Sequence, residues 1–445
     1  MMALSRDTIF SLSSAPGRAG VSVFRVSGEA SGKVLDSLIK KARPLPRYAS
    51  LKKLYDGDGL IDEALVLWMP APKSFTGQDC VEFHVHGSPA VIEALAMALL
   101  QRNCRQAEAG EFTRRAVENN KMDLTEAEGL ADLIDAETQG QRKQAMRQMQ
   151  GGLRDLYNAW RESLLDALAQ IEGEIDFPDE GDIPDSLSHK AYPYLNDVMV
   201  SMQKSLLGAH RGERVRSGLD ITIIGAPNSG KSSIINYLAD RDAAIISDIA
   251  GTTRDIIDVQ LNLGGLPVRL SDTAGLRDTS DVIEAEGVRR AKVRAQESDI
   301  RVYVQDSTNA DWDMTALSKF SDLDFVLVNK VDLGTLPVPP ALKPDHYYVS
   351  AVTGENLEAF RDELERRVIE MFSPSQDAGL TRARHRDCVK RANQALGYAL
   401  KHLADAPELA GDDIRTALTA LKELAGEVDI EAVFDRIFSR FCVGK

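Results

Sequence analysis

The sequence has few cysteines and no long apolar segment. We expect neither a disulfide framework nor a zinc site, because the cysteines are far apart and form no C-x-x-C pair. No apolar run reaches the roughly 18 residues of a membrane span, and no basic, apolar leader opens the chain. We therefore expect a soluble, cytoplasmic protein with reduced thiols. The four cysteines are Cys80, Cys104, Cys388 and Cys442.

An excess of positive charge is also lacking. The 445 residues carry a net charge of −15, which argues against a protein that covers nucleic acid with most of its surface. Any RNA contact must be local or shared with a partner. A single hydrophobic core usually stops growing near ~250–300 residues, so the length indicates two or three domains.

The strongest motif is a glycine-rich loop within LDITIIGAPNSGKSSIINYL, residues 219–238. An apolar strand leads into Gly225-x-x-x-x-Gly230-Lys231-Ser232, and a helical pattern follows. The loop backbone can wrap phosphates, the lysine can reach the β and γ oxygens, and the serine hydroxyl can bind magnesium. The predicted nucleotide-binding residues of the loop are Asn228, Ser229, Gly230, Lys231, Ser232 and Ser233.

Three further motifs follow in order, each directly after a candidate parallel strand. Such motifs meet at the carboxyl edge of one sheet, where these folds bind ligands. The carboxylate of Asp332 can accept two hydrogen bonds from guanine that adenine does not supply, so we predict GTP. The motifs are Asp272-Thr273-Ala274-Gly275, Asn329-Lys330-Val331-Asp332 and Ser350-Ala351.

A switch segment is expected between the phosphate loop and Asp272, where a hydroxyl is needed for magnesium and the γ-phosphate. We assign Thr253 to the metal, together with Ser232. The segment's predicted nucleotide contacts are Ser247, Asp248, Ile249, Ala250, Gly251, Thr252 and Thr253.

The water-orienting glutamine of Ras-like enzymes is missing, because Leu276 follows the D-T-A-G motif. Another group must then assist hydrolysis. In related enzymes an arginine finger does so and raises the rate roughly 10³–10⁵-fold. One hypothesis is a monovalent cation held by Asn228 and by carbonyls of 247–252, with Glu284 placing the attacking water. The alternative is an internal finger, Arg277 or Arg254, and Glu284 can equally be part of a solvated helix face.

The predicted fold class is multidomain α/β plus α. Residues 1–120 show short β-type runs between Gly and Pro turns, typical of an α+β domain. A Ras-like P-loop G domain, 216–374, is expected as an insertion in a discontinuous helical bundle formed by 121–215 and 375–445. Helical spacing supports the bundle: the apolar residues are Leu153, Leu156, Trp160, Leu164, Leu168 and Ile171 before the G domain, and Ile414, Leu418 and Leu421 after it.

His84 and His86 are expected to share one face of a strand. Two histidines can begin a metal site, but no third ligand is evident. We therefore favour histidines that pack or form hydrogen bonds.

The chain as a whole resembles the MnmE family of tRNA modification GTPases, also called TrmE. The stretches that carry this resemblance span the chain in order: APGRAGVSVFRVSG, SFTGQDCVEFHVHG, AGEFTRRAVENNKMDLTEAE, GAPNSGKSS, DIAGTTRD, DTAGLR and FCVGK. The resemblance implies a folate-binding-like N-terminal domain that forms a homodimer. It also implies an FAD-dependent partner, MnmG, and modification at carbon 5 of the wobble uridine in certain tRNAs.

Roles for single residues follow from the same resemblance. A 5-formyl-tetrahydrofolate-type cofactor is expected at Arg25, Glu82, Lys121 and the C-terminal Lys445. Potassium is expected to promote hydrolysis and G-domain dimerisation, with Glu284 as the catalytic glutamate beside Asn228 and Lys231. The residues that match the potassium ligands are Asn228, Ser247, Ile249 and Thr252.

The last residues, Phe441-Cys442-Val443-Gly444-Lys445, place a cysteine where prenylated GTPases have one. Gly444 and Lys445 do not fit a prenylation motif, so a tail that reaches the folate site is the better interpretation. Cys442 is either a buried structural thiol or a reactive one. A regulatory ribosome-assembly GTPase is the alternative function, although no basic RNA-binding appendage follows residue 374.

Overall fold

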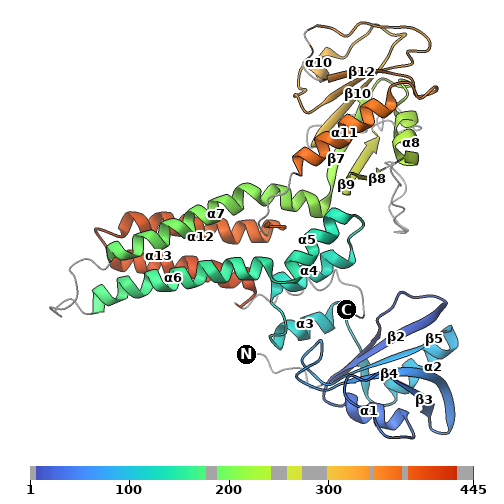
Figure 1. Ribbon diagram of the computed structural model, residues 1–445, viewed down its shortest axis with the longest axis vertical. Coiled ribbons are helices and arrows are strands. Elements are labelled where there is room, and N and C mark those ends of the chain that lie inside the picture. Colours follow the sequence, from blue (N-terminus) through green and yellow to red (C-terminus); the bar gives the residue numbers. More distant parts are fainter. Residues whose placement is uncertain are drawn as a thin grey trace, which may run out of the picture. The chain divides into compact units, whose positions relative to one another are not determined.

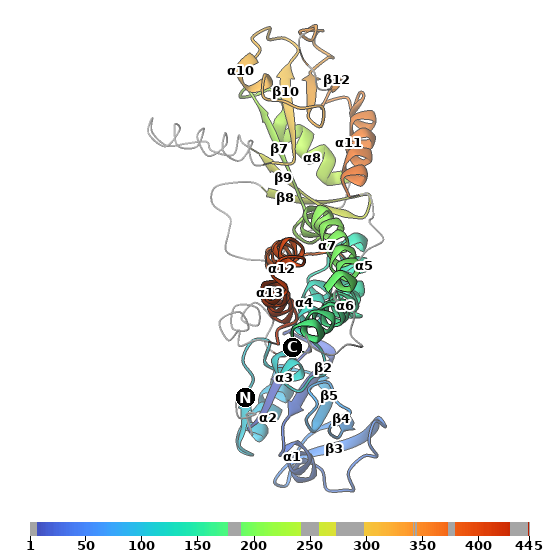
Figure 2. The same ribbon diagram turned by 90° about the vertical axis from the view of Figure 1, so that its left-hand side faces the viewer.

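The computed structural model describes residues 7–176, 188–241, 258–272, 298–340, 342, 345–372, 379–427 and 444. Figures 1 and 2 show the helices and strands of the chain, which contacts divide into two compact units. One unit contains residues 1–131, 149–154 and 418–445, and the other contains 132–148 and 155–417.

The first unit is built on a six-stranded sheet of order β3-β4-β5-β2-β1-β6. The β-type runs of residues 1–120, which are DTIFSL, GVSVFRVSG, DEALVLWM and DCVEFHVHG, form β1, β2, β4 and β5, while β3 and β6 were not predicted. Their pairings are antiparallel except for β6, which runs parallel to β1. The bounds are β1 Thr8–Leu12, β2 Ala19–Ser27, β3 Ser50–Asp56, β4 Gly59–Met69, β5 Cys80–Gly87 and β6 Cys104–Gln106.

Two helices, α1 (Ser31–Leu38) and α2 (Pro89–Leu100), share a core with one face of this sheet. Leu35 and Leu99 are fully buried there with Phe24 and Phe83. Alternate residues of the strands therefore face away from these helices and are available for a site.

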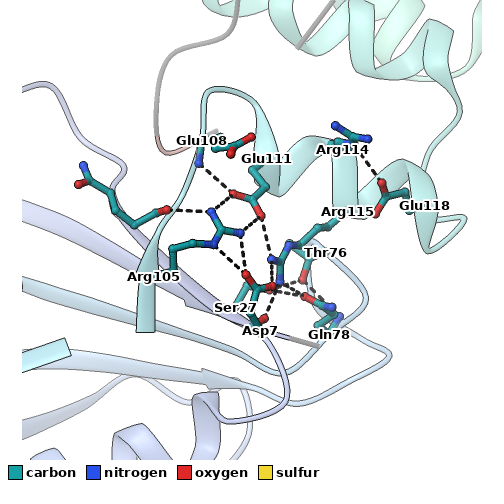
Figure 3. Close-up of polar contacts among 11 residues, drawn as sticks. Asp7, Ser27, Thr76, Gln78, Arg105, Glu108, Glu111, Arg114, Arg115 and Glu118 are labelled. Carbon is teal, nitrogen blue, oxygen red and sulfur yellow. Dashed lines mark hydrogen bonds and ion pairs between the residues drawn. The ribbon is translucent and has the colours of Figure 1, made fainter. Parts of the chain in front are cut away.

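Helix α3 (Glu111–Glu118) is joined to the sheet by a network of charged groups (Figure 3). Arg115, whose side chain is 4% exposed, donates to Asp7 at 2.7 Å, to Glu111 at 2.8 Å and to the Gln78 amide oxygen at 3.1 Å. Gln78 also accepts from Ser27 of β2. The network fixes the loop at residues 74–79 against both α3 and the sheet.

Helices dominate the rest of the chain before and after the second sheet. Helix α12 packs along α7, where Arg386 donates to Glu213 at 2.9 Å. The predicted periodicity in α6 is confirmed except at Leu156, which is half-buried, while Tyr157 is buried instead. The bounds are α4 Leu124–Ile134, α5 Gln139–Met149, α6 Gly152–Asp176, α7 Ser188–Ser217, α12 Ala383–His402 and α13 Pro407–Ala425.

The second sheet has the order β12-β11-β10-β7-β9-β8. All neighbouring pairs are parallel except the β8–β9 hairpin. Helices α8 and α11 share a core with one face, and α10 packs with the other. The bounds are β7 Leu219–Gly225, α8 Lys231–Arg241, β8 Asp258–Leu263, β9 Leu266–Asp272, β10 Ile300–Asp306, α10 Met314–Leu317, β11 Phe325–Asn329, β12 Asp345–Val349 and α11 Leu357–Met371.

The turn of the β8–β9 hairpin contacts the start of helix α5. Gly264 and Gly265 both have positive φ, 60° and 81°, as a tight two-residue hairpin turn requires. The amide of Gly140 donates to the carbonyl of Gly265 at 2.8 Å. A Cβ at residue 140 would lie 2.9 Å from the Gly265 carbonyl oxygen, which belongs to the backbone and cannot turn aside, so this approach needs glycine.

Within the described residues, no helix is long and apolar enough to cross a bilayer.

The carboxylate of Glu111 should make the stability of α3 depend on pH. Burial opposes its ionisation, but donors from Arg105, the Glu108 amide and Arg115 outweigh burial and lower its pKa below the ordinary 4.5. Its stabilising effect is therefore complete above that value and is lost as pH falls through the lower, folded-state pKa. We expect Glu111→Gln to weaken α3 by about 2 kcal/mol at pH 7.

Hydrogen exchange of the α3 amides in the full-length chain measures this difference at pH 7 and pH 4. The control is Glu118→Gln, which removes only a partly exposed pair with Arg114. If the difference in α3 stability between Glu111→Gln and wild type is as large at pH 4 as at pH 7, the charge of Glu111 is not what stabilises α3.

Candidate functional site

The glycine-rich loop connects β7 to α8 and depends on unusual backbone angles. Asn228 and Gly230 have φ of 61° and 99°. A Cβ on Gly230 would overlap the side-chain amide nitrogen of Asn329. The loop therefore turns tightly enough to direct backbone N–H groups at the start of α8 toward an anion.

Lys231 begins α8 and lies over this loop. Its side chain reaches back so that Nζ donates to the carbonyl oxygens of Gly225 at 2.9 Å and Ala226 at 2.7 Å. The residue is 4% exposed, whereas Ser232 and Ser233 are exposed at the helix start. An ammonium group is thus held at the position where nucleotide phosphates bind in loops of this kind.

Asn329, at the end of β11, joins the phosphate loop to the predicted base-binding loop. Its amide nitrogen donates to the Ser229 carbonyl at 2.8 Å, and its amide oxygen accepts from the Ala351 N–H at 3.0 Å. It is 1% exposed, so these bonds are shielded from competing water. The observed contacts therefore join the two loops, and a contact of Asn329 with the base stays a prediction.

The residues predicted to bind guanine are oriented by two further contacts. Asp332 accepts from the hydroxyl of Ser350 at 2.5 Å. The Lys330 ammonium lies 2.6 Å from Asp306. Burial of Asp306 opposes ionisation, but the donors from Lys330 and Thr308 outweigh it and lower the pKa of this carboxyl.

The prediction that the motifs meet at one sheet edge is confirmed for β7, β9, β11 and β12. Asp272 ends β9 opposite Ile223 of β7. Sequence reasoning missed β10 and Asp306, although the run RVYVQDS, residues 301–307, carries the signal of a buried strand that ends in polar residues.

Several predicted residues lie outside the described part of the chain, and their roles stay predictions. They are Ser247, Asp248, Ile249, Ala250, Gly251, Thr252, Thr253, Arg254, Thr273, Ala274, Gly275, Leu276, Arg277, Glu284, Cys442 and Lys445.

A second group of polar residues lies on the face of the first sheet that α1 and α2 leave uncovered. Arg25 of β2 donates to Glu82 of β5 at 2.9 and 3.0 Å, and Glu82 also contacts His84 at 3.3 Å. The Arg25 guanidinium lies 5.2 and 5.8 Å from the ring centroids of Phe75 and Phe112. Phe75 was not singled out from the sequence, although it lies within SFTGQD.

The histidines of β5 form hydrogen bonds, as favoured above. His84 contacts Glu82, and His86 lies 2.8 Å from Asp62. Within the described residues, no group of three or more potential ligands could hold a metal ion.

Lys121 lies beside the loop between β4 and β5 that contains Phe75. Gly444 lies against β1. Lys121 Nζ donates to the carbonyl of Pro72 at 2.9 Å. The carbonyl of Gly444 accepts from the Ser13 hydroxyl at 3.0 Å, and a Cβ on Gly444 would lie 2.5 Å from the Leu12 carbonyl oxygen.

The parallel sheet, the glycine-rich loop with its lysine, and the ordered D-T-A-G, N-K-V-D and S-A motifs define a P-loop GTPase. Its substrate is GTP and its reaction is GTP hydrolysis. Enzymes of this class use Mg²⁺ with the bound nucleotide.

Comparison with known proteins identifies the family. Profiles described as "GTP-binding protein TrmE N-terminus" and "MnmE helical domain" match residues 8–121 and 124–442. A tRNA modification GTPase MnmE from Maricaulis maris is 53% identical over 98% of this chain and 99% of its own length. The chain belongs to the MnmE, or TrmE, family of GTPases.

Other relatives agree with this assignment. MnmE from Paramagnetospirillum magneticum is 47% identical and MnmE from Caulobacter vibrioides 44% identical, each over 99% of this chain and 100% of its own length. Among solved structures, the G domain of the FeoB iron transporter of T. maritima is 21% identical over 34% of this chain and 98% of its own, with a TM-score of 0.26.

Replacing Gly230 should disturb the contact on which the phosphate loop depends. Gly230→Ala places a methyl group against Asn329 and imposes a strained φ, which costs about 1–3 kcal/mol. We expect affinity for a fluorescent GTP analogue to fall about tenfold to a hundredfold.

The matched control is Gly334→Ala, because a Cβ there meets nothing within 4 Å. Equal affinities for the two variants would show that the contact between Gly230 and Asn329 does not control the shape of the loop.

Proposed function

We propose that this chain is a potassium-activated GTPase that acts on tRNA with an FAD-dependent partner, MnmG. Together they add an aminomethyl or carboxymethylaminomethyl group to carbon 5 of the wobble uridine, with a tetrahydrofolate as one-carbon donor. The relatives' printed name, tRNA modification GTPase, supports the reaction class. The arrangement of Arg25, Glu82, Phe75 and Gly444 carries the folate part of the proposal.

The residues of the first sheet fit a folate chemically. A carboxylate such as Glu82 accepts hydrogen bonds from the amino and N–H groups of a pterin, and Phe75 and Phe112 offer flat apolar surface to its ring. The glutamate end of the ligand is acidic, which suits Lys121, whereas Arg25 lies at the pterin end because it holds Glu82. When bound, the folate would supply the one-carbon unit, and the chain's own residues would hold and orient it.

Gly444 supports the proposal that the C-terminal tail completes this site. Ser11 and Arg25 are cross-strand neighbours, and so are Arg25 and Glu82. Gly444 lies against Leu12 and Ser13 at the end of the same strand β1. Lys445 follows it directly in the chain, and we propose it as a further cationic contact for the folate.

For hydrolysis, we propose that the phosphate loop positions GTP while a potassium ion replaces an arginine finger. Asn228 is exposed at the rim of the loop with its backbone in the left-handed region, a position from which its amide oxygen can reach a cation beside the phosphates. Ser247, Ile249 and Thr252 would complete the ion's ligands, Glu284 would orient water, and Ser232 and Thr253 would bind magnesium.

We further propose that the G domain, 216–374, is inserted into a helical domain formed by 121–215 and 375–445. Contacts between segments on either side of the G domain support this: Thr381 donates to Gln148 at 2.8 Å, and Arg382 pairs with Asp132 at 2.6 Å. The N-terminal domain, 1–120, is the proposed folate site and homodimer contact. A cytoplasmic location fits a tRNA substrate.

Hydrolysis should depend on the identity of the monovalent cation. We expect GTP turnover at least about tenfold faster in potassium than in sodium at equal ionic strength. The reason is that the bound cation would stabilise transition-state charge, a role in which an arginine finger raises the rate by up to ~10³–10⁵. Asn228→Ala should remove this difference. Equal steady-state rates in both salts for the unaltered protein would refute the cation site.

The modification itself can be measured by nucleoside mass spectrometry of bulk tRNA from cells that lack this gene. We expect the carbon-5 aminomethyl-type wobble uridines to disappear and to return when the intact protein is expressed. Unchanged nucleosides would overturn the tRNA and folate assignments together and leave a guanine-specific GTPase, such as a ribosome-assembly factor.

A further inference from the structure

One segment of the N-terminal domain has the opposite charge balance from the chain as a whole. Residues 39–53, IKKARPLPRYASLKK, contain six Lys or Arg residues and no acidic residue, although the chain carries a net charge of −15. The segment leads from the end of α1 to the edge strand β3, and most of its residues are exposed.

Hydrogen bonds hold two cations of this segment in place. One bonds to the backbone of the segment itself, and the other bonds to the loop that follows β4. Lys52 of β3 donates to the carbonyl of Ala42 at 2.9 Å, which brings it beside Lys41. Arg47 donates through its backbone to Trp68 at 2.8 Å and through its guanidinium to the carbonyl of Lys73. We refer to Lys41, Arg47, Lys52 and Lys73 as the basic strip.

The other cations of the segment are matched by carboxylates. Lys40 pairs with Asp58, Arg43 forms two hydrogen bonds with Asp36, and Lys53 lies opposite Glu63 in the β3–β4 register. In the described residues, the four basic-strip side chains form no ion pair with a carboxylate. Their charge is therefore available to an anionic partner.

The loop that carries the basic strip is shaped before any partner binds. Pro44 is buried, Arg47 holds a φ of 67°, and the Tyr48 amide closes a turn on Leu45 at 3.1 Å. Tyr48 and Leu45 are nevertheless 67% and 69% exposed. An exposed aromatic ring next to a cation that the fold holds in place, Arg47, is a combination on which a nucleic-acid base can stack while a phosphate is bound.

Lys73, at one end of the basic strip, lies next to the proposed one-carbon site. Lys73 follows Pro72, whose carbonyl accepts from Lys121. Two residues further, the ring of Phe75 lies 5.2 Å from the Arg25 guanidinium. The basic strip then follows the edge of the sheet, because Lys52 is on the face covered by α1 and α2 whereas Arg25 is on the other face.

We propose that the basic strip binds the ribose-phosphate backbone of the tRNA substrate and that Tyr48 stacks on one of its bases. This inference rests on the proposed function and adds the location of the RNA contact. RNA is favoured over an acidic protein segment because phosphates use the charge and bases use the exposed ring, whereas a carboxylate-rich peptide uses only the charge.

Binding of tRNA to the full-length protein by fluorescence anisotropy, over a range of salt concentrations, tests the proposal. The test variant replaces Lys41, Arg47, Lys52 and Lys73 with Gln. We expect tRNA affinity to fall about tenfold or more, and the slope of log K against log salt to shrink by about 3, since each neutralised phosphate contributes about 0.7–0.9. Tyr48→Ala alone should weaken binding about tenfold.

The matched control replaces four exposed cations elsewhere, Arg142, Lys143, Arg147 and Arg211, with Gln. It changes the net charge equally and should leave affinity and salt slope near wild type. GTP hydrolysis without tRNA should be the same in both variants. Equal weakening in the two variants, or unchanged binding in the test variant, would overturn the proposal.

Two further measurements separate other occupants of this surface. If tRNA binding stays intact while an oligoglutamate peptide loses affinity for the test variant, the basic strip serves the acidic tail of a folate instead. A change from dimer to monomer by sedimentation would assign it to self-association. If nucleoside analysis shows no wobble modification, the proposed function fails, whereas modification with unaltered tRNA affinity rejects only the basic strip.

Discussion

The amide side chain of Asn329 is the interaction on which the nucleotide site depends. One buried group joins the carbonyl of Ser229, in the loop that would hold the phosphates, to the N–H of Ala351, in the loop that would close on the base. Because the side chain is shielded from water, breaking either bond would leave a buried polar atom without a partner, which costs more than an exposed bond would. The two loops predicted to bind the two ends of GTP are thus held together by one residue of the sheet.

In the N-terminal domain, a charged side chain joins segments that are far apart in the sequence. Arg115 joins the start of β1, helix α3 and the loop that contains Gln78, and this loop carries Phe75 to Arg25. The same loop begins with the residues that contact Lys121 and Arg47. A single segment of about ten residues therefore links the proposed carbon-donor site with the proposed RNA surface.

Much of the G domain was predictable because each motif requires one particular backbone arrangement. A glycine-rich loop between strand and helix, and short polar motifs after apolar runs, fix the sheet edge without knowledge of packing. The contacts of Asn329 and the pairing of Lys330 with Asp306 were not predictable, since they join residues whose separation in space depends on sheet order. Strand β3 was missed because it is a charged edge strand with little alternation, and β6 because it is three residues long. Phe75 has no local signal at all, because its significance comes from Arg25 on another strand.

The contact between Gly140 and the β8–β9 turn has a consequence for how this chain can vary. Strand β8 begins after the predicted switch segment, and β9 ends at Asp272 of the D-T-A-G motif, so the hairpin is the covalent connection between these two predicted nucleotide-binding regions. Its tip abuts the first turn of α5 with no space for a methyl group. A residue inserted in the turn, or a side chain at position 140, would displace both the hairpin and the start of α5. The length of this hairpin and the residue at the start of that helix therefore constrain each other.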